Sequence, residues 1–186
     1  MLNNTLIDSL KNDDHRAMDE LFERYWEFVF DAAFKKLGNE EIAQDITQEI
    51  FISLWENRLN LELAGSLAGY LYGAVKYRVI NYFKAEAMRS GHQAEVSYLM
   101  NLEISKETDA DLLLQDLNKD VEFALNQLPE KMRLVVSMSR KHDRSIKEIA
   151  SELGISVQTV KNQLTAAMKI LRKNLSYVLL LALLLC

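Results

Sequence analysis

Residues that break helices are scarce in this sequence. Its 186 residues contain one proline and six glycines, so most stretches are long enough for helices of several turns. These stretches are rich in Leu, Ala, Glu, Lys and Ile, and none shows a convincing strand pattern of alternating apolar and polar residues. The sequence therefore predicts an all-α protein with short polar connections.

Cysteine and histidine are also rare. The one cysteine is the last residue, Cys186, so an internal disulfide is impossible and a reducing compartment is expected. His15, His92 and His142 lie far apart, and none has a Cys or His neighbour at a zinc-ligand spacing. Paired carboxylates, a nucleophile beside a base and a phosphate-binding loop are missing too. We therefore expect no metal, no cofactor, no small-molecule substrate and no enzymatic activity.

The two ends of the chain carry no membrane signal. The amino terminus lacks a basic start followed by an apolar core, which excludes a secretory signal and predicts a cytoplasmic protein. The last ten residues, 177–186, are apolar, but a membrane span needs about 20. This tail is expected to pack on its own domain or on a protein partner.

The most informative stretch runs from residue 145 to residue 165. Apolar residues at 146, 149, 150 and 153 predict a short helix that begins at Ser145 and ends at Gly154. Ser156 then caps a second helix. Its inward residues are predicted to be Val157, Val160 and Leu164, and its solvated face carries Gln158, Lys161, Asn162 and Thr165. The pattern is that of a helix-turn-helix.

The solvated face of this second helix suits the major groove of DNA. Gln and Asn pair bidentately with adenine, Lys reaches guanine or phosphate, and Thr bonds phosphate oxygens. Residues 130–175 contain ten Lys or Arg against four Asp or Glu, although the whole chain carries a net charge of -5. We predict a recognition helix. The alternative is a helical hairpin with an ordinary polar face.

Three amphipathic helices are predicted in the first ninety residues. The first spans about 14–37, with apolar positions at Leu21, Tyr25, Phe28, Val29, Ala32, Ala33 and Leu37. The second spans about 39–56, with an apolar row at Ile42, Ile46, Ile50 and Leu54 and a polar side at Asp45, Gln48, Glu49, Ile52 and Glu56. The polar side is either an ordinary solvated face or a binding strip. A loop at 57–66 precedes the third helix.

The third helix, 67–89, alternates aromatic and basic residues. It carries four tyrosines and the basic residues Lys76, Arg78, Lys84 and Arg89. Rings stack on unpaired bases and cations pair with phosphates, so this mixture suits melted nucleic acid. The alternative, that the tyrosines hold the helices together, stays open.

An acidic stretch separates these helices from the helix-turn-helix. Between residues 90 and 120, seven Asp or Glu stand against two Lys, and apolar residues are sparse before residue 112. A solubilising tether is the simpler interpretation, and an acidic mimic of nucleic acid is the other. We therefore predict two small helical domains, 1–93 and 119–176, joined by a flexible acidic linker, 94–118, and followed by the apolar tail, 177–186.

Two segments in this order resemble a known family. AQDITQEIFISLW, residues 43–55, resembles the helix by which bacterial sigma factors bind core RNA polymerase. LPEKMR, residues 128–133, followed by residues 145–172, resembles the domain that reads the upstream promoter element. The order, the acidic linker and the length are those of the extracytoplasmic-function (ECF) group of the sigma-70 family. The resemblance covers nearly the whole chain.

The resemblance implies roles for individual residues. Those implied to bind polymerase are Asp45, Gln48, Glu49, Phe51, Leu54 and Trp55. Those implied to capture the downstream promoter element are Tyr70, Lys76, Tyr77, Arg78 and Asn81. Those implied to read the upstream element are Gln158, Thr159, Lys161, Asn162 and Thr165. Two positions depart from the common pattern, because Tyr77 replaces the usual Asn and Ala85 stands where a basic residue is frequent.

The resemblance also implies partners and a mechanism without bond chemistry. The partners are core RNA polymerase, promoter DNA and an anti-sigma factor, which in this family is often tethered to a membrane. The expected function is to direct polymerase to promoters and to promote their melting. A stand-alone helix-turn-helix regulator is one alternative, and a helical adaptor that does not bind DNA is another.

Overall fold

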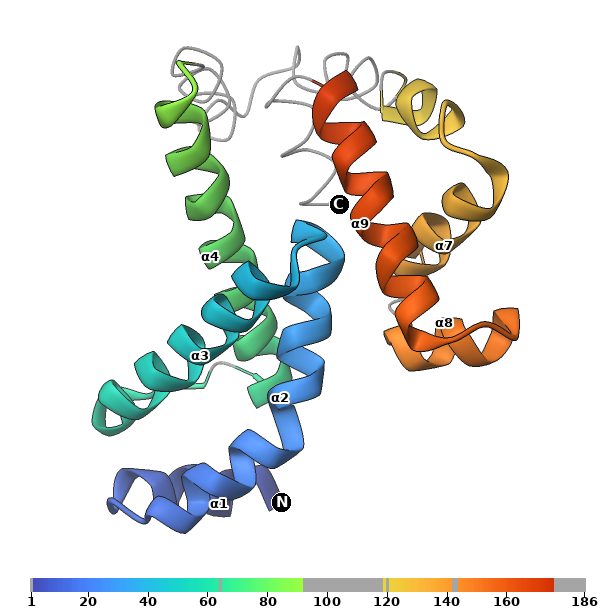
Figure 1. Ribbon diagram of the computed structural model, residues 1–186. Helices are drawn as coiled ribbons and strands as arrows, with labels where there is room; N and C mark the ends of the chain where they lie inside the picture. Colours follow the sequence, from blue (N-terminus) through green and yellow to red (C-terminus); the bar gives the residue numbers. More distant parts are fainter. Residues whose placement is uncertain (1, 64, 92–118, 120, 142–143, 176–186) are drawn as a thin grey trace. The chain divides into compact units, whose positions relative to one another are not determined.

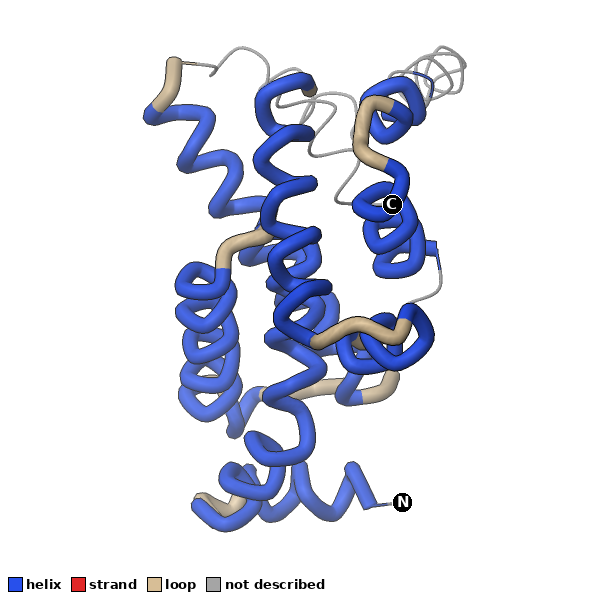
Figure 2. The backbone as a smooth tube through the Cα atoms, turned by 45° about the vertical axis from the view of Figure 1, so that its right-hand side comes forward, coloured by secondary structure: helices blue, strands red, loops and turns tan. Residues whose placement is uncertain are grey.

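Every regular element in the described part of the chain is a helix, which confirms the all-α prediction (Figures 1 and 2). The computed structural model describes residues 2–63, 65–91, 119, 121–141 and 144–175. The chain folds as two compact units, Met1–Val79 and Ile80–Cys186. The predicted linker, 94–118, and the apolar tail, 177–186, lie outside the described residues.

The first unit is built on the packing of two antiparallel helices. They are α2, His15–Leu37, and α3, Glu40–Glu56, and each lays an apolar stripe against the other. Their buried side chains include Leu21, Val29, Phe34, Ile46 and Leu54. Helix α4, Leu67–Arg89, follows a connection that contains one short 3-10 helix, η1, Arg58–Asn60, and the first unit ends within α4, at Val79. The three helices predicted from the sequence are therefore present.

The boundary between α2 and α3 is set by two residues. Gly38 ends α2 with φ of 62°, a left-handed conformation that glycine adopts at little cost, and its N–H donates to Phe34 O at 2.7 Å. Asn39 begins α3 by accepting a hydrogen bond from the Ile42 amide at 3.2 Å. This two-residue connection forces the helices back along each other, so their apolar stripes face.

Three features of the first unit differ from the sequence prediction. A helix not predicted, α1, Leu2–Lys11, buries Leu6, Ile7 and Leu10 and contacts α2 and η1. Phe28, predicted to point inward, is 41% exposed, because α2 buries a narrower stripe than its many apolar residues suggested. The expected loop at 57–66 contains η1. The sequence of α1 carries a signal that could have predicted it, because Leu2, Leu6, Ile7 and Leu10 recur at helical spacing.

Arg58 fastens the start of the chain to the end of α3. Its Nε lies 2.5 Å from Asp13 Oδ1, its Nη1 donates to Trp55 O at 2.8 Å, and its guanidinium lies 4.2 Å from the Trp55 ring centre. The His15 ring contacts the same indole, with centroids 4.6 Å apart. Trp55 thus contacts both a cation and an imidazole, and the connection between α1 and α2 is joined to the end of α3.

We expect Arg58→Ala to destabilise the full-length protein by roughly 1–2 kcal/mol, because it removes a cation–π contact, a backbone hydrogen bond and a partly buried stem together. Denaturant unfolding that follows tryptophan fluorescence measures this change. Arg16→Ala, on an exposed arginine at the start of α2, is the matched control and should shift the unfolding free energy by less than about 0.5 kcal/mol. Equal effects of the two substitutions would contradict the role assigned to Arg58.

The second unit contains the helix-turn-helix. Helix α7, Glu130–Lys141, precedes α8, Ile146–Leu153, and α9, Val157–Asn174, and the three pack on one another. Gly154 joins α8 to α9 with φ of 64°, and Ser156 caps α9 by accepting from the Thr159 amide at 3.0 Å. Their common core consists of Val135, Val136, Ile146, Ile149, Val160, Leu164 and Leu171. The predicted turn and both caps are confirmed.

Two features are absent from the described residues. No helix there combines the length and the hydropathy that crossing a bilayer requires. No group of three or more His, Cys, Asp or Glu side chains in that part of the chain is arranged to hold a metal ion.

Candidate polymerase and DNA interfaces

The solvated side of α3 presents one strip of mixed chemistry. Asp45, Gln48 and Glu49 are all exposed, and Ile52 is 56% exposed beside them. At 100° per residue these four positions fall within about 100° of the helix circumference. The strip therefore offers carboxylates, an amide and an aliphatic side chain to a partner, without any change in the α2–α3 packing.

The three apolar residues of the same predicted set lie elsewhere. Phe51 is 2% and Leu54 is 1% exposed, and both belong to the core between α2 and α3. Trp55 is half-buried and held by His15 and Arg58. The family resemblance grouped all six residues as one binding region, whereas the structure divides them between a solvated strip and the support beneath it, as the apolar row predicted from the sequence already indicated for Leu54.

An aromatic cluster that sequence analysis missed lies at the seam of α2 and α3. The Phe22 ring lies 4.6 Å from that of Trp26 and 5.0 Å from that of Phe51, measured between centroids. Phe22 is 40% exposed, so the cluster reaches the surface. The sequence could have predicted this cluster, because Phe22 and Trp26 are four residues apart and so share one face of α2.

The predicted DNA-binding residues of α4 are spread around the helix. Tyr70 and Tyr77 are 38% and 66% exposed, and with half-buried Asn81 they fall within about 40° of one line on the helix. Lys76 lies on the flank, where its Nζ is 5.3 Å from the Tyr72 ring centre. Arg78 lies on the opposite flank and pairs with Glu49 of α3. The structure thus brings together the two tyrosines and the asparagine.

The predicted face of α9 is solvated over its first turns. Gln158, Asn162 and Thr165 are exposed, and Thr159 and Lys161 are half-exposed. Gln158 Nε2 donates to Asn162 Oδ1 at 2.9 Å, so the two amides are already aligned along one edge of the helix. The Thr159 hydroxyl lies 2.8 Å from the Ser156 hydroxyl within the cap. Val157, predicted to point inward, is 39% exposed, because it begins the helix ahead of the packed turns.

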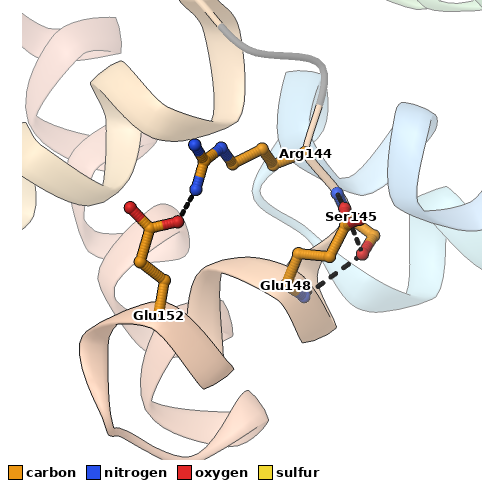
Figure 3. A network of polar contacts seen from close by, with 4 residues as sticks. All are labelled: Arg144, Ser145, Glu148 and Glu152. Carbon is orange, nitrogen blue, oxygen red and sulfur yellow. Dashed lines mark hydrogen bonds and ion pairs between the residues drawn. The ribbon is translucent and has the colours of Figure 1, made fainter.

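The start of α8 is fixed by a small polar network (Figure 3). Ser145 Oγ accepts a hydrogen bond from the Glu148 amide at 3.2 Å, and Glu148 Oε2 accepts one from the Ser145 amide at 2.7 Å. This reciprocal pair is a capping box. Arg144 and Glu152 form an ion pair beside it. The network fixes the start of α8, against which α9 packs.

Loss of the Ser145 hydroxyl is expected to destabilise the helix-turn-helix by about 1 kcal/mol, because one amide at the helix start then lacks its acceptor. Ser145→Ala, compared with the wild type by thermal unfolding of the full-length chain, measures it. Ser145→Thr keeps the hydroxyl and should retain most of the stability. If both variants unfold at the wild-type temperature, the capping box contributes nothing measurable.

Comparison with known proteins accounts for both units. Residues 21–89 match the family model of sigma-70 region 2, and residues 119–171 match that of sigma-70 region 4. The chain is 26% identical over 176 residues to the ECF RNA polymerase sigma factor SigW of Bacillus subtilis, covering 91% of this chain and 94% of that protein. It is 23% identical over 173 residues to SigK of Mycobacterium tuberculosis H37Rv, covering 91% of each chain.

The fold and these surfaces define a two-part, all-helical protein of the helix-turn-helix DNA-binding class. The two family matches occur in order in one chain, and the similarity to SigW extends over nearly its full length. The chain belongs to the sigma-70 family of RNA polymerase sigma factors, within the ECF group. Sigma factors are transcription initiation factors without catalytic activity of their own, and the stand-alone regulator is not favoured.

Proposed function

We propose that the exposed strip of α3 is the surface by which this sigma factor docks on core RNA polymerase. Asp45 and Gln48 supply the polar contacts, and Ile52 supplies exposed apolar area between them. Phe51 and Leu54 support the strip from the core, and Trp55 fixes the end of α3. The exposed edge of Phe22 extends the apolar part toward α2. A partly apolar centre with a polar margin is the usual composition of a protein interface.

The exposed line of α4 is proposed to hold bases of the melted downstream promoter element. Tyr77 and Tyr70 offer ring faces for stacking, and Asn81 offers an amide to a base edge. Lys76 and Arg78, on the two flanks, are proposed to pair with phosphates on either side of the stacked bases. Extruding a base costs a few kcal/mol, which stacking and pocket contacts must offset.

The solvated face of α9 is proposed to read the upstream element as duplex DNA. Gln158 and Asn162 are suited to base edges in the major groove, while Lys161 and Thr165 are suited to guanine and phosphate. Thr159, whose hydroxyl lies within the α9 cap, is proposed to contribute mainly by holding the helix start against the DNA backbone.

The two DNA contacts are each weak, but together they bind the promoter tightly when both domains are bound to the same polymerase. Joining them in one assembly replaces the second binding event by an intramolecular one at a high effective concentration. In this proposal region 2 occupies residues 1–93 and the helix-turn-helix domain occupies 119–176, with 94–118 as the linker. The protein acts in the cytoplasm, and an anti-sigma factor covers one or both surfaces until a signal releases it.

The observation that carries this function is the presence, in one chain, of an exposed α3 strip and a separate solvated recognition helix. Transcription from a candidate promoter with a bacterial core RNA polymerase, with and without the full-length protein, tests it. The protein should raise promoter-specific transcript well above the level from core enzyme alone. Unchanged transcript, or operator binding by the protein alone at physiological salt, would reject the proposal.

A further inference from the structure

One ion pair joins a residue of the proposed polymerase-binding strip on α3 to a residue of the proposed DNA-binding surface on α4. Arg78 Nη1 of α4 lies 2.5 Å from Glu49 Oε2 of α3. The Arg78 side chain is 34% exposed and that of Glu49 is 54% exposed, so the pair is solvated. The family resemblance assigns Glu49 to the polymerase-binding residues and Arg78 to the DNA-binding residues, but in the structure the two side chains form an ion pair.

The ion pair lies beside an open groove of about 470 Å³ between α3 and α4. Its lining residues are Ile50, Ser53, Gly69, Tyr70, Gly73, Ala74, Tyr77 and Arg78. A Cβ added to Gly73 would meet no atom within 4 Å, so the absence of side chains here leaves open space along α4. Arg78 is therefore held on the wall of a groove that both exposed tyrosines of α4 also line.

The pairing leaves Arg78 able to bind a second anion. A guanidinium carries five N–H donors in a planar fork, which exceed what one carboxylate oxygen accepts. A long arginine side chain without a neighbouring anion samples many rotamers, and fixing it during DNA binding would cost conformational entropy. Because Glu49 already holds the Arg78 guanidinium beside the groove, part of this conformational entropy is lost before DNA binds.

The position of Glu49 also sets it apart from the rest of the α3 strip. On the α3 circumference Glu49 lies on the α4 side of Asp45, whereas Gln48 and Ile52 lie on the other side, by about 60° and 20°. Glu49 is thus the residue of the strip that faces α4, and its Oε2 is directed at Arg78.

We infer that Glu49 is a positioning residue for Arg78, and that it serves capture of the promoter strand rather than polymerase docking. The inference rests on the proposed function of α4 in holding the downstream element. Glu49 keeps the guanidinium on the wall of the groove, where it meets a phosphate of the strand whose bases stack on Tyr70 and Tyr77.

The test uses full-length Glu49→Gln, Arg78→Gln, the double variant, and the charge swap Glu49→Arg with Arg78→Glu. Glu41→Gln, on an exposed carboxylate in the first turn of α3, is the matched control. Three quantities are measured: affinity for core polymerase, binding of the assembled holoenzyme to a promoter with a pre-melted downstream element, and thermal stability.

Glu49→Gln and Arg78→Gln should each weaken holoenzyme binding to the pre-melted promoter by roughly 3–10-fold, and the double variant should lose little more. Affinity for core polymerase should stay within about 2-fold, and Tm should shift by less than about 4 °C, as expected for a solvated pair. The charge swap restores the ion pair, so it should restore Tm, but it moves the cation to α3 and should not restore promoter binding.

Two results would overturn the inference. If Glu49→Gln weakens core binding 5-fold or more while promoter binding by assembled holoenzyme is unchanged, Glu49 belongs to the docking strip. If the charge swap restores promoter binding as fully as Tm, the pair has a structural role alone. Failure of the proposed function is distinguishable, because then Tyr77→Ala would also leave binding to the pre-melted promoter unchanged.

Discussion

Asp45→Arg combined with Gln48→Ala is expected to weaken binding to core RNA polymerase by roughly 100–1000-fold. The two substitutions remove a carboxylate and an amide from either side of Ile52 in the docking strip, and the arginine introduces repulsion toward any cation that Asp45 faces. Both residues are solvated, so the fold should remain. Competition between labelled wild-type protein and the variant for a limiting amount of core polymerase measures the effect.

Asp8→Arg makes the same charge change on an exposed residue of α1 and serves as the control. It should bind core polymerase within about 3-fold of the wild type, since long-range charge effects are screened at physiological salt. If both variants lose affinity equally, net charge rather than the α3 strip governs the association. If neither loses affinity, polymerase binds another surface.

Substitutions on α9 should separate base reading from phosphate binding. Gln158→Ala and Asn162→Ala are each expected to lower holoenzyme affinity for the intact upstream element by roughly 10–100-fold, with little effect on a scrambled element. Lys161→Ala should weaken binding to both sequences and lower the slope of log affinity against log salt by about 1. Titration of matched and scrambled duplexes at several salt concentrations measures both quantities.

Gln127→Ala removes an exposed amide of the same unit away from α9, and it should leave both affinities unchanged. A uniform loss for all the α9 variants on both sequences would mean that the helix contacts phosphates without reading bases. Unchanged affinities would place the upstream contact on another element. The hydrogen bond between Gln158 and Asn162 predicts that the Gln158→Ala, Asn162→Ala double variant loses less than the sum of the single effects.

The sequence was sufficient where local chemistry determines the structure. Ser145, Gly154 and Ser156 carry the caps and the turn of the helix-turn-helix within twelve residues, and all three act as predicted. The bounds of α4, Leu67–Arg89, were also predicted correctly, because Gly65 and Ser66 precede it and its apolar residues recur at helical spacing through Gly69 and Gly73. Caps and periodicity are short-range signals, so a single sequence records them.

The sequence was insufficient where a residue acts on a distant one. Arg58 meets Asp13 across forty-five positions, and Arg78 meets Glu49 across twenty-nine. No spacing rule predicts such pairs, because they depend on how the helices cross. The burial of Leu54, in contrast, was predicted from the apolar row on α3; only the family resemblance grouped Phe51 and Leu54 with the solvated Asp45.

If region 2 and the helix-turn-helix domain of this sigma factor bind one promoter simultaneously, transcription should depend on the spacing between the two promoter elements. Transcription is measured with reconstituted holoenzyme before and after insertion of 5 base pairs between the upstream and downstream elements. The insertion rotates one element by about half a turn relative to the other. Transcript should fall at least about 10-fold while binding to core polymerase is unchanged. Equal transcript from the two promoters would contradict simultaneous binding.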